Sequence, residues 1–189
     1  RGALDAGGHV VDIALATTEM LYFAVAHYGY DGGVMISASH NEGQYNGFKF
    51  VRAGAQAISS DTGLFDIRDR VAHMQEKKLP ADPYPLYSPP VTYKDIRNEY
   101  VDYLLEKFAP KKCKQFRIVA SANFGMAGVM LGRLIERGRL PVTVVPFDYE
   151  PDGAFPKGKP DPLIPERRKE TEALVRKEKP DFGITWDAD

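Results

Sequence analysis

The stretch Gly32–Phe50, GGVMISASHNEGQYNGFKF, changes character halfway along its length. Val34, Met35 and Ile36 form a short apolar run typical of a buried strand, and small polar residues follow at once. In open α/β sheets, ligands bind beyond the carboxyl ends of strands, and Ser39 stands just past such an end. This order of residues predicts a strand that leads into a reactive loop.

The loop contains the residue types that group transfer requires. Ser39 could act as a nucleophile or carry a phosphoryl group, while His40 or Lys49 could move its proton or stabilise an anion. Gly43 and Gly47 permit tight turns. Taken alone, the loop could equally be a surface turn with a capping serine. The chain has no Gly-x-Ser-x-Gly elbow and no P-loop motif, which disfavours hydrolases and P-loop NTPases.

The composition is that of a globular protein. Of the 189 residues, 43% are hydrophobic and 27% are charged, so the chain can bury a core. The formal net charge is −1, which favours neither nucleic acid nor a membrane surface as a partner. No apolar run is long enough to span a bilayer. The single cysteine, Cys113, excludes an internal disulfide and fits a cytoplasmic location.

Alternating strand and helix patterns predict an α/β protein with largely parallel sheets. We expect Thr17 or Thr18 to cap the first helix, Gly29 to end it, and Gly138 to end a later one. Strands are predicted over residues 9–16, 34–36, 48–53, 116–122, 141–147 and 182–186, with 48–53 antiparallel. Helices are predicted over 17–28, 65–77, 125–138 and 166–179, and along the stripe Ile96, Tyr100, Leu104 and Phe108.

Five prolines within Leu79–Tyr93 forbid a helix there and favour an extended connector. We therefore predict a first domain over residues 1–85 and a second over 86–189. Each is expected to be a three-layer α/β/α domain with a mixed, largely parallel sheet. The first residues include no initiator Met, and the last ones follow an apolar run directly. We interpret the chain as a fragment in which the first domain lacks its start and the second is truncated.

The stretch ISASHNEGQYNGFKF resembles the phosphoserine signature of the α-D-phosphohexomutases, the phosphomannomutase/phosphoglucomutase group. The usual form is Thr-Ala-Ser-His-Asn-Pro, followed by Tyr-Asn-Gly-Phe-Lys. Ser37 replaces the threonine here and Glu42 replaces the proline. VVDIALATTEMLYFA and PDGAFPKGKPDPLIPE also resemble segments of that family, in the same order along the chain. The resemblance covers nearly the whole sequence.

The resemblance implies a reversible conversion of hexose 6-phosphate and hexose 1-phosphate, with mannose or glucose as the sugar. Ser39 would carry a phosphoryl group and donate it, which gives a hexose 1,6-bisphosphate. Lys49 would assist proton transfer and charge stabilisation, and His40 would chiefly orient the loop. Asn41 and Asn46 would complete the loop that holds substrate and phosphate.

The same resemblance implies a magnesium site. DFGITWDAD is similar to the start of the family's Asp-Gly-Asp-x-Asp loop, with Ala188 in place of glycine. Asp187 and Asp189 match the first two metal-binding aspartates, and Ser39 would contribute an oxygen to the same ion. Mg²⁺ prefers such carboxylate and phosphate oxygens. Without the resemblance, a terminal Asp-x-Asp would be read as a solvated chain end.

Two other functions stay open at this point. A sugar-phosphate-binding or regulatory relative could keep the fold without turnover. A phosphatase with an Asp-x-Asp motif is disfavoured, because such enzymes place the nucleophilic aspartate after an early strand. We expect the 189-residue chain alone to be inactive. The unfinished sheet of the second domain could also pair with a second copy and give a dimer.

Overall fold

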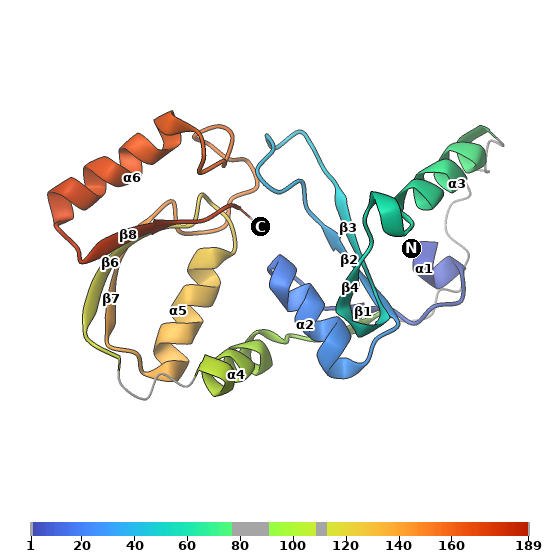
Figure 1. Cartoon of the computed structure of the whole chain (residues 1–189), viewed down its shortest axis with the longest axis horizontal. Coiled ribbons are helices and arrows are strands. Elements are labelled where there is room, and N and C mark those ends of the chain that lie inside the picture. The colour runs from blue at the N-terminus through green and yellow to red at the C-terminus, as the bar shows by residue number, and fades with distance from the viewer. Residues whose placement is uncertain (1, 77–90, 109–112, 189) are drawn as a thin grey trace.

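The computed structural model describes residues 2–76, 91–108 and 113–188, and it is an α/β structure (Figure 1). No helix in these ranges is both long and apolar enough to cross a membrane. The helices are α1 (Gly2–Asp5), α2 (Thr18–Tyr28), α3 (Leu64–Glu76), α4 (Arg97–Phe108), α5 (Ala127–Gly138) and α6 (Pro165–Glu178), with short 3-10 turns η1 (Ala53–Ala55) and η2 (Ser60–Thr62). The strands are β1 (Val11–Asp12), β2 (Gly32–Ile36), β3 (Phe48–Arg52), β4 (Gln56–Ala57), β5 (Thr92–Tyr93), β6 (Phe116–Ser121), β7 (Val142–Phe147) and β8 (Phe182–Thr185).

The first half contains an antiparallel sheet in the order β2-β3-β4. Val34 lies opposite Phe50 in the β2–β3 register, which confirms the predicted antiparallel strand. A separate two-residue parallel pair joins β1 to β5. The strand predicted over residues 9–16 is wrong in length. Asp12 Oδ1 accepts the N–H of Ala14 over 2.7 Å, and Ala14 has a left-handed φ of 59°, so a side-chain turn ends the strand.

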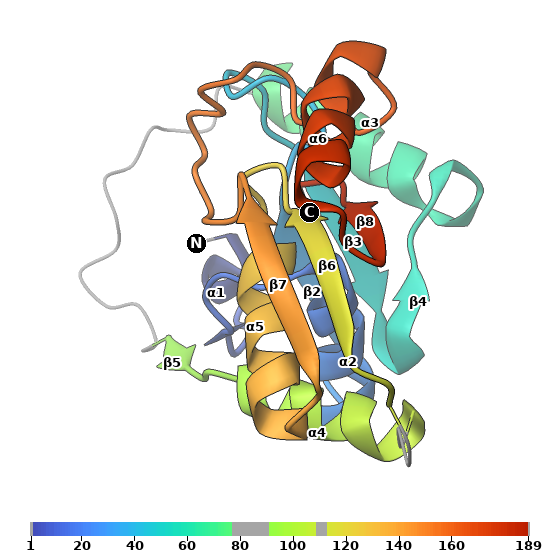
Figure 2. The ribbon, with the colours of Figure 1, turned by 90° about the vertical axis from the view of Figure 1, so that its left-hand side faces the viewer.

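The second half contains a fully parallel sheet in the order β7-β6-β8. Ile118 of the central strand lies opposite Val144 on one side and Phe182 on the other. The crossover through α5 runs from β6 to β7, and the crossover through α6 runs back from β7 past β6 to β8. Because the two crossovers run in opposite directions, α5 and α6 cover opposite faces of the sheet (Figures 1 and 2). The predicted alternation of strands and helices is confirmed here, and with it the α/β class.

The ends of α2 and α5 lie where the sequence predicts them. The Thr17 side chain accepts the N–H of Met20, and Gly29 closes α2 with a φ of 66°, as predicted. The prediction that this helix ends at Gly138 is also confirmed, and the left-handed residue that follows the helix is Arg139, with a φ of 46°. A Cβ at Gly138 would lie 2.7 Å from Leu105 Cδ2. An alanine at this position would require the end of the Leu105 side chain, on α4, to move aside.

Helix α2 is buried on two sides and joins the two halves of the chain. Met20 is fully buried and belongs to a core cluster that includes Ile96 and Met130. On another face of α2, Val25 packs against Val51 of β3. The predicted boundary near residue 85 falls in 77–90, outside the described residues.

The predicted inward stripe along α4 is correct only in part. Ile96 is fully buried, and Tyr100 packs against the same core cluster. Phe108 is 77% exposed, whereas Val101 is fully buried. The inward face of α4 therefore shifts by one position after its first turn, and it is Val101 that carries the contact with the core.

The contacts between Asp95 and Arg97 at the start of α4 should stabilise the fold in a way that depends on pH. Asp95 accepts the Arg97 guanidinium over 2.7 and 2.5 Å and the Arg97 backbone N–H over 3.0 Å. These contacts hold the pKa of the Asp95 carboxyl at about 2, below its ordinary 3.8. Because the folded pKa is depressed, the stabilisation is full above about pH 4 and disappears as the pH falls toward 2.

We expect Asp95→Asn to lower the free energy of unfolding at pH 7 by about 0.5 kcal/mol. The amount is small because the Asp95 side chain is half exposed and water screens the ion pair. The difference from wild type should shrink between pH 5 and pH 3 in urea titrations. Asp66→Asn in exposed α3 is the control. A pH-independent difference would contradict this account.

Candidate active site

The loop between β2 and β3 is closed at its neck by backbone contacts. The N–H of Ser37 donates to the Gly47 carbonyl over 3.0 Å. A Cβ on Gly47 would lie 2.8 Å from the Ser37 carbonyl oxygen, so only glycine allows the two chain segments to come this close. The Ser37 hydroxyl also accepts the N–H of Ser39 over 2.9 Å. These contacts fix residues 37–47 as a compact loop above the sheet.

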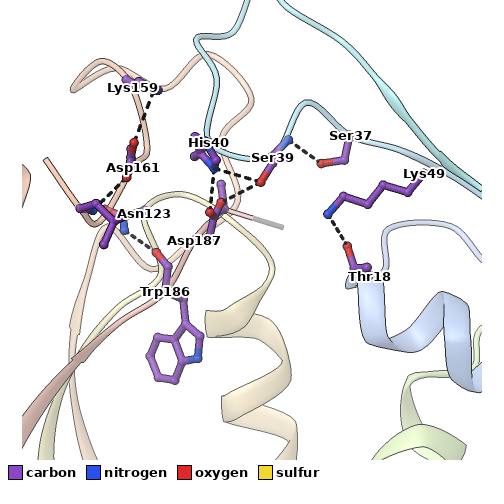
Figure 3. A network of polar contacts seen from close by, with 12 residues as sticks. Thr18, Ser37, Ser39, His40, Lys49, Asn123, Lys159, Asp161, Trp186 and Asp187 are labelled. Atoms are coloured by element: carbon purple, nitrogen blue, oxygen red, sulfur yellow. Dashed lines mark hydrogen bonds and ion pairs between the residues drawn. The ribbon is translucent and has the colours of Figure 1, made fainter. Parts of the chain in front are cut away.

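Ser39 has a left-handed backbone, with a φ of 55°. This conformation costs a non-glycine residue about 1–2 kcal/mol, so the surrounding loop must stabilise it. The N–H of Asn41 donates to the Ala38 carbonyl over 3.1 Å and closes a turn around the serine. The turn directs the Ser39 side chain away from β2 and toward the second half of the chain (Figure 3).

The Ser39 side chain meets Asp187, which is 148 positions later in the sequence. Ser39 Oγ donates to Asp187 Oδ1 over 3.3 Å, and His40 Nδ1 lies 2.9 Å from Asp187 Oδ2. His40 Nδ1 is also 3.2 Å from Ser39 Oγ (Figure 3). Asp187 follows the end of β8, so the carboxyl ends of strands from the two halves come together. Three of the residues predicted from sequence thus form one contact group.

Lys49 lies on β3, where its ammonium donates to Thr18 Oγ1 at the start of α2 over 3.1 Å (Figure 3). Asn41 and Asn46 are exposed and line a cavity of about 480 Å³ together with Ser39. Asn46 Oδ1 also accepts the N–H of Gly47 over 2.9 Å. The predicted phosphate loop therefore opens on a cavity large enough for a phosphorylated sugar, whereas Lys49 is not among the residues that line it.

Sequence reasoning did not single out Asp161 or Lys159, which lie beside the group. Asp161 accepts the backbone N–H of Leu163 over 2.9 Å and pairs with Lys159 at 3.4 Å. The Leu163 N–H, then Lys159 and finally the charge of His40 lower the pKa of the Asp161 carboxyl. Both residues belong to PDGAFPKGKPDPLIPE, which resembles a family segment as a whole but contains no pattern that marks either residue. The segment also reaches the serine loop, where a Cβ on Gly43 would lie 3.0 Å from the Gly153 carbonyl oxygen.

The donor atoms that meet at Asp187 suit magnesium. A carboxylate and a serine oxygen are hard ligands of the kind that Mg²⁺ prefers. Within the described ranges, no three His, Cys, Asp or Glu side chains gather closely enough to hold a metal. Asp189, the other predicted carboxylate, lies outside the described residues. The described part therefore supplies two oxygen donors that fit the ion.

Family models match both halves of the chain. Residues 1–78 match the phosphoglucomutase/phosphomannomutase α/β/α domain I, and residues 98–189 match α/β/α domain II of the same family. The chain belongs to this family. The resemblance seen in the Ser39 loop is thereby confirmed.

Curated relatives of this chain carry names from the same family. It is 39% identical to an Escherichia coli phosphomannomutase and 40% identical to Xanthomonas campestris phosphohexose mutases, and both alignments cover all of it. A crystal structure of a Burkholderia thailandensis phosphoglucomutase/phosphomannomutase family protein superposes with a TM-score of 0.76 at 27% identity. That superposition covers the whole chain and 40% of the neighbour. The chain spans about 40% of the length of these curated relatives.

Gly125 packs closely against the backbone of the segment that contains Asp187. A Cβ at Gly125 would lie 2.1 Å from the Ala188 carbonyl oxygen, which is backbone and cannot rotate away. We expect Gly125→Ala to lower the free energy of unfolding by about 1–3 kcal/mol, the usual cost of overpacking. Thermal unfolding would measure this as a fall in Tm of several degrees.

Gly132 gives the matched control on the next helix. It lies within α5, and nothing is within 4 Å of an added Cβ. Because alanine is the better helix former, Gly132→Ala should raise stability by about 0.5–1 kcal/mol. Equal effects of the two substitutions on Tm would show that the Gly125 contact is not limiting.

Proposed function

We propose that this chain provides the phosphoryl-carrying and metal-binding parts of a phosphohexomutase. The enzyme would interconvert hexose 6-phosphate and hexose 1-phosphate, with mannose or glucose as the sugar. The observation that carries the proposal is the contact of Ser39 Oγ with the Asp187 carboxylate across the two halves of the chain. The relatives named phosphomannomutase and phosphohexose mutases support it.

In the proposed reaction, Ser39 carries the phosphoryl group between two sugar positions. The bond from Ser39 Oγ to phosphorus breaks while a sugar hydroxyl oxygen forms the new bond to phosphorus. The proton of that hydroxyl passes to Ser39 Oγ, which becomes a free hydroxyl again. The product is a hexose 1,6-bisphosphate. After the sugar has turned over, its other phosphoryl group returns to Ser39, so the enzyme ends as it began. No outside oxidant or second phosphate donor is consumed.

The neighbouring side chains have distinct parts in this proposal. Lys49 brings a positive charge and hydrogen-bond donors close to the anionic transition state. His40 bridges Ser39 and Asp187, so it holds the serine loop against the end of β8. Asn41 and Asn46 offer amide groups to a phosphate in the cavity. Bound Mg²⁺ would neutralise charge on the moving phosphoryl group, with Asp187, Asp189 and the Ser39 oxygen as ligands.

The domain division at residue 85 and a cytoplasmic location are parts of the same proposal. The gap between the matched segments, residues 79–97, contains the predicted connector. Since the chain spans about 40% of its relatives, we propose that further residues supply sugar recognition, and that the 189 residues alone do not turn over substrate.

Glu42 gives an observation in favour of the second candidate function, a sugar-phosphate-binding relative without turnover. It stands where the family signature has proline. Its carbonyl accepts the N–H of Tyr45 over 2.9 Å, so it begins the turn that follows Ser39. A carboxylate there opposes a dianionic phosphoserine by about 1 kcal/mol at moderate screening. Such repulsion would shorten the life of the phosphoserine.

Intact mass and steady-state kinetics test the role of Ser39. We expect a fraction of the purified full-length protein to be about 80 Da heavier, the mass of one phosphoryl group, and to lose it upon addition of hexose phosphate. Ser39→Ala should lack the heavier species and lose more than ~10³-fold in kcat, because the covalent route disappears. Ser60→Ala, in exposed η2, should match wild type in both measurements.

Two results would reject the proposal. The first is near-wild-type turnover in Ser39→Ala. The second is a heavier species that persists in that variant, which would place the phosphoryl group on another residue. Wild-type protein that binds hexose phosphate, yet shows neither the heavier species nor turnover, would instead favour the binding relative.

A further inference from the structure

A buried ion pair lies behind the site and takes no direct part in the proposed chemistry. Arg167 on α6 and Asp148 after β7 have side chains that are only 9% and 6% exposed, and they meet at 3.2 Å. Lys157 reaches the other oxygen of Asp148 at 2.7 Å. Burying charges costs desolvation energy that their attraction often fails to recover, so such a group is weak evidence for stability. Its position suggests a different role.

The pair holds the side chain of Asn123, which lies in the turn between β6 and α5. Arg167 Nη2 donates to Asn123 Oδ1 over 3.1 Å, so the carbonyl side of the amide is occupied. The NH₂ side must then face β8, where it donates to Thr185 Oγ1 over 3.1 Å and to the Trp186 carbonyl. Asn123 is 3% exposed and has a left-handed φ of 47°. Its amide is thus fixed in one orientation between α6 and the end of β8.

Trp186 is held on both of its backbone groups immediately before Asp187. Its N–H donates to the Ser121 carbonyl of β6 over 3.0 Å, and its carbonyl accepts from Asn123. That carbonyl belongs to the peptide plane that leads into Asp187 (Figure 3). Fixing the plane therefore fixes the direction in which the Asp187 side chain leaves the sheet.

We propose that Asn123 is a positioning residue that directs Asp187 at Ser39, with Arg167 and Asp148 holding it from behind. The functional part of this inference rests on the proposed phosphoryl transfer. Reacting groups must keep their geometry closely, since a displacement of about 1 Å can cost about 10²-fold in rate. A neutral amide suits the role because it supplies donors to a carbonyl without adding a charge beside the carboxylate.

Asn123→Asp tests the inference with little change in size. The substitution replaces the NH₂ donors by an oxygen that faces the Trp186 carbonyl, so two acceptors oppose each other. Trp186 is the single tryptophan of the chain, and its fluorescence reports on this segment without substrate or metal. We expect acrylamide to quench Trp186 at least twofold more efficiently in the variant. In the full-length enzyme, kcat should fall about 10²-fold while KM stays within about threefold.

Val101→Ala is the control for a general loss of stability. Val101 is fully buried in the core around α2 and α4, away from β8. Val101→Ala should lower Tm while leaving Trp186 quenching and the kcat at 20 °C within twofold of wild type. Circular dichroism shows whether each variant is folded. Should Asn123→Asp fail to fold, Arg167→Lys, which retains the charge but not the planar fork, takes its place with a smaller expected change in the same direction.

The outcomes separate this inference from the function on which it rests. Unchanged quenching in a folded Asn123→Asp variant overturns the positioning role, whatever the activity. Equal quenching in Asn123→Asp and Val101→Ala also overturns it, because the effect would then be general. If quenching rises as expected but wild-type full-length protein converts no hexose phosphate, the positioning of the Trp186–Asp187 segment stands and the proposed function fails.

Discussion

The burial of α2 on two faces is the constraint on which the remaining structure depends. Met20 fixes the helix against the second half of the chain, while Val25 fixes it against β3 of the first half. The Ser39 loop leaves from β2, which packs on the same helix, so its distance from the end of β8 is set through α2. An exposed loop can hold an unfavourable backbone conformation only when the elements beneath it are rigid.

Much of this arrangement follows from local sequence, and the exceptions have physical causes. The cap at Thr17 and the end at Gly29 depend on neighbouring residues alone, and both are as predicted. Residues 9–16 have strand composition, yet the Asp12 side chain bonds its own backbone and competes with the sheet. Gly138 ends α5 as predicted, but the Leu105 side chain that packs against it is remote in sequence. Contacts between residues that are remote in sequence leave no pattern in the local sequence.

The residues of the candidate site also divide into those that the sequence reveals and those that it does not. The family signature around Ser39 and the aspartate at Asp187 could both be found in the sequence, because reactive groups follow strand ends. Asn123 could not, since an asparagine between a strand and a helix is ordinary turn chemistry. Its partners are known only once β8 is placed next to β6. Asn123 and Arg167 are far apart in the sequence, and their contact depends on the strand order of the sheet.

That strand order also has a consequence for how the protein is made. The central strand β6 is synthesised before both of its neighbours, and its pairing with β8 closes only after residue 185 has been added. The contact between Ser39 and Asp187 then spans 148 positions, a long loop whose entropy must be overcome late. Non-local parallel pairing of this kind slows folding. During synthesis on the ribosome, one edge of β6 is therefore exposed while the chain that will cover it is still being made.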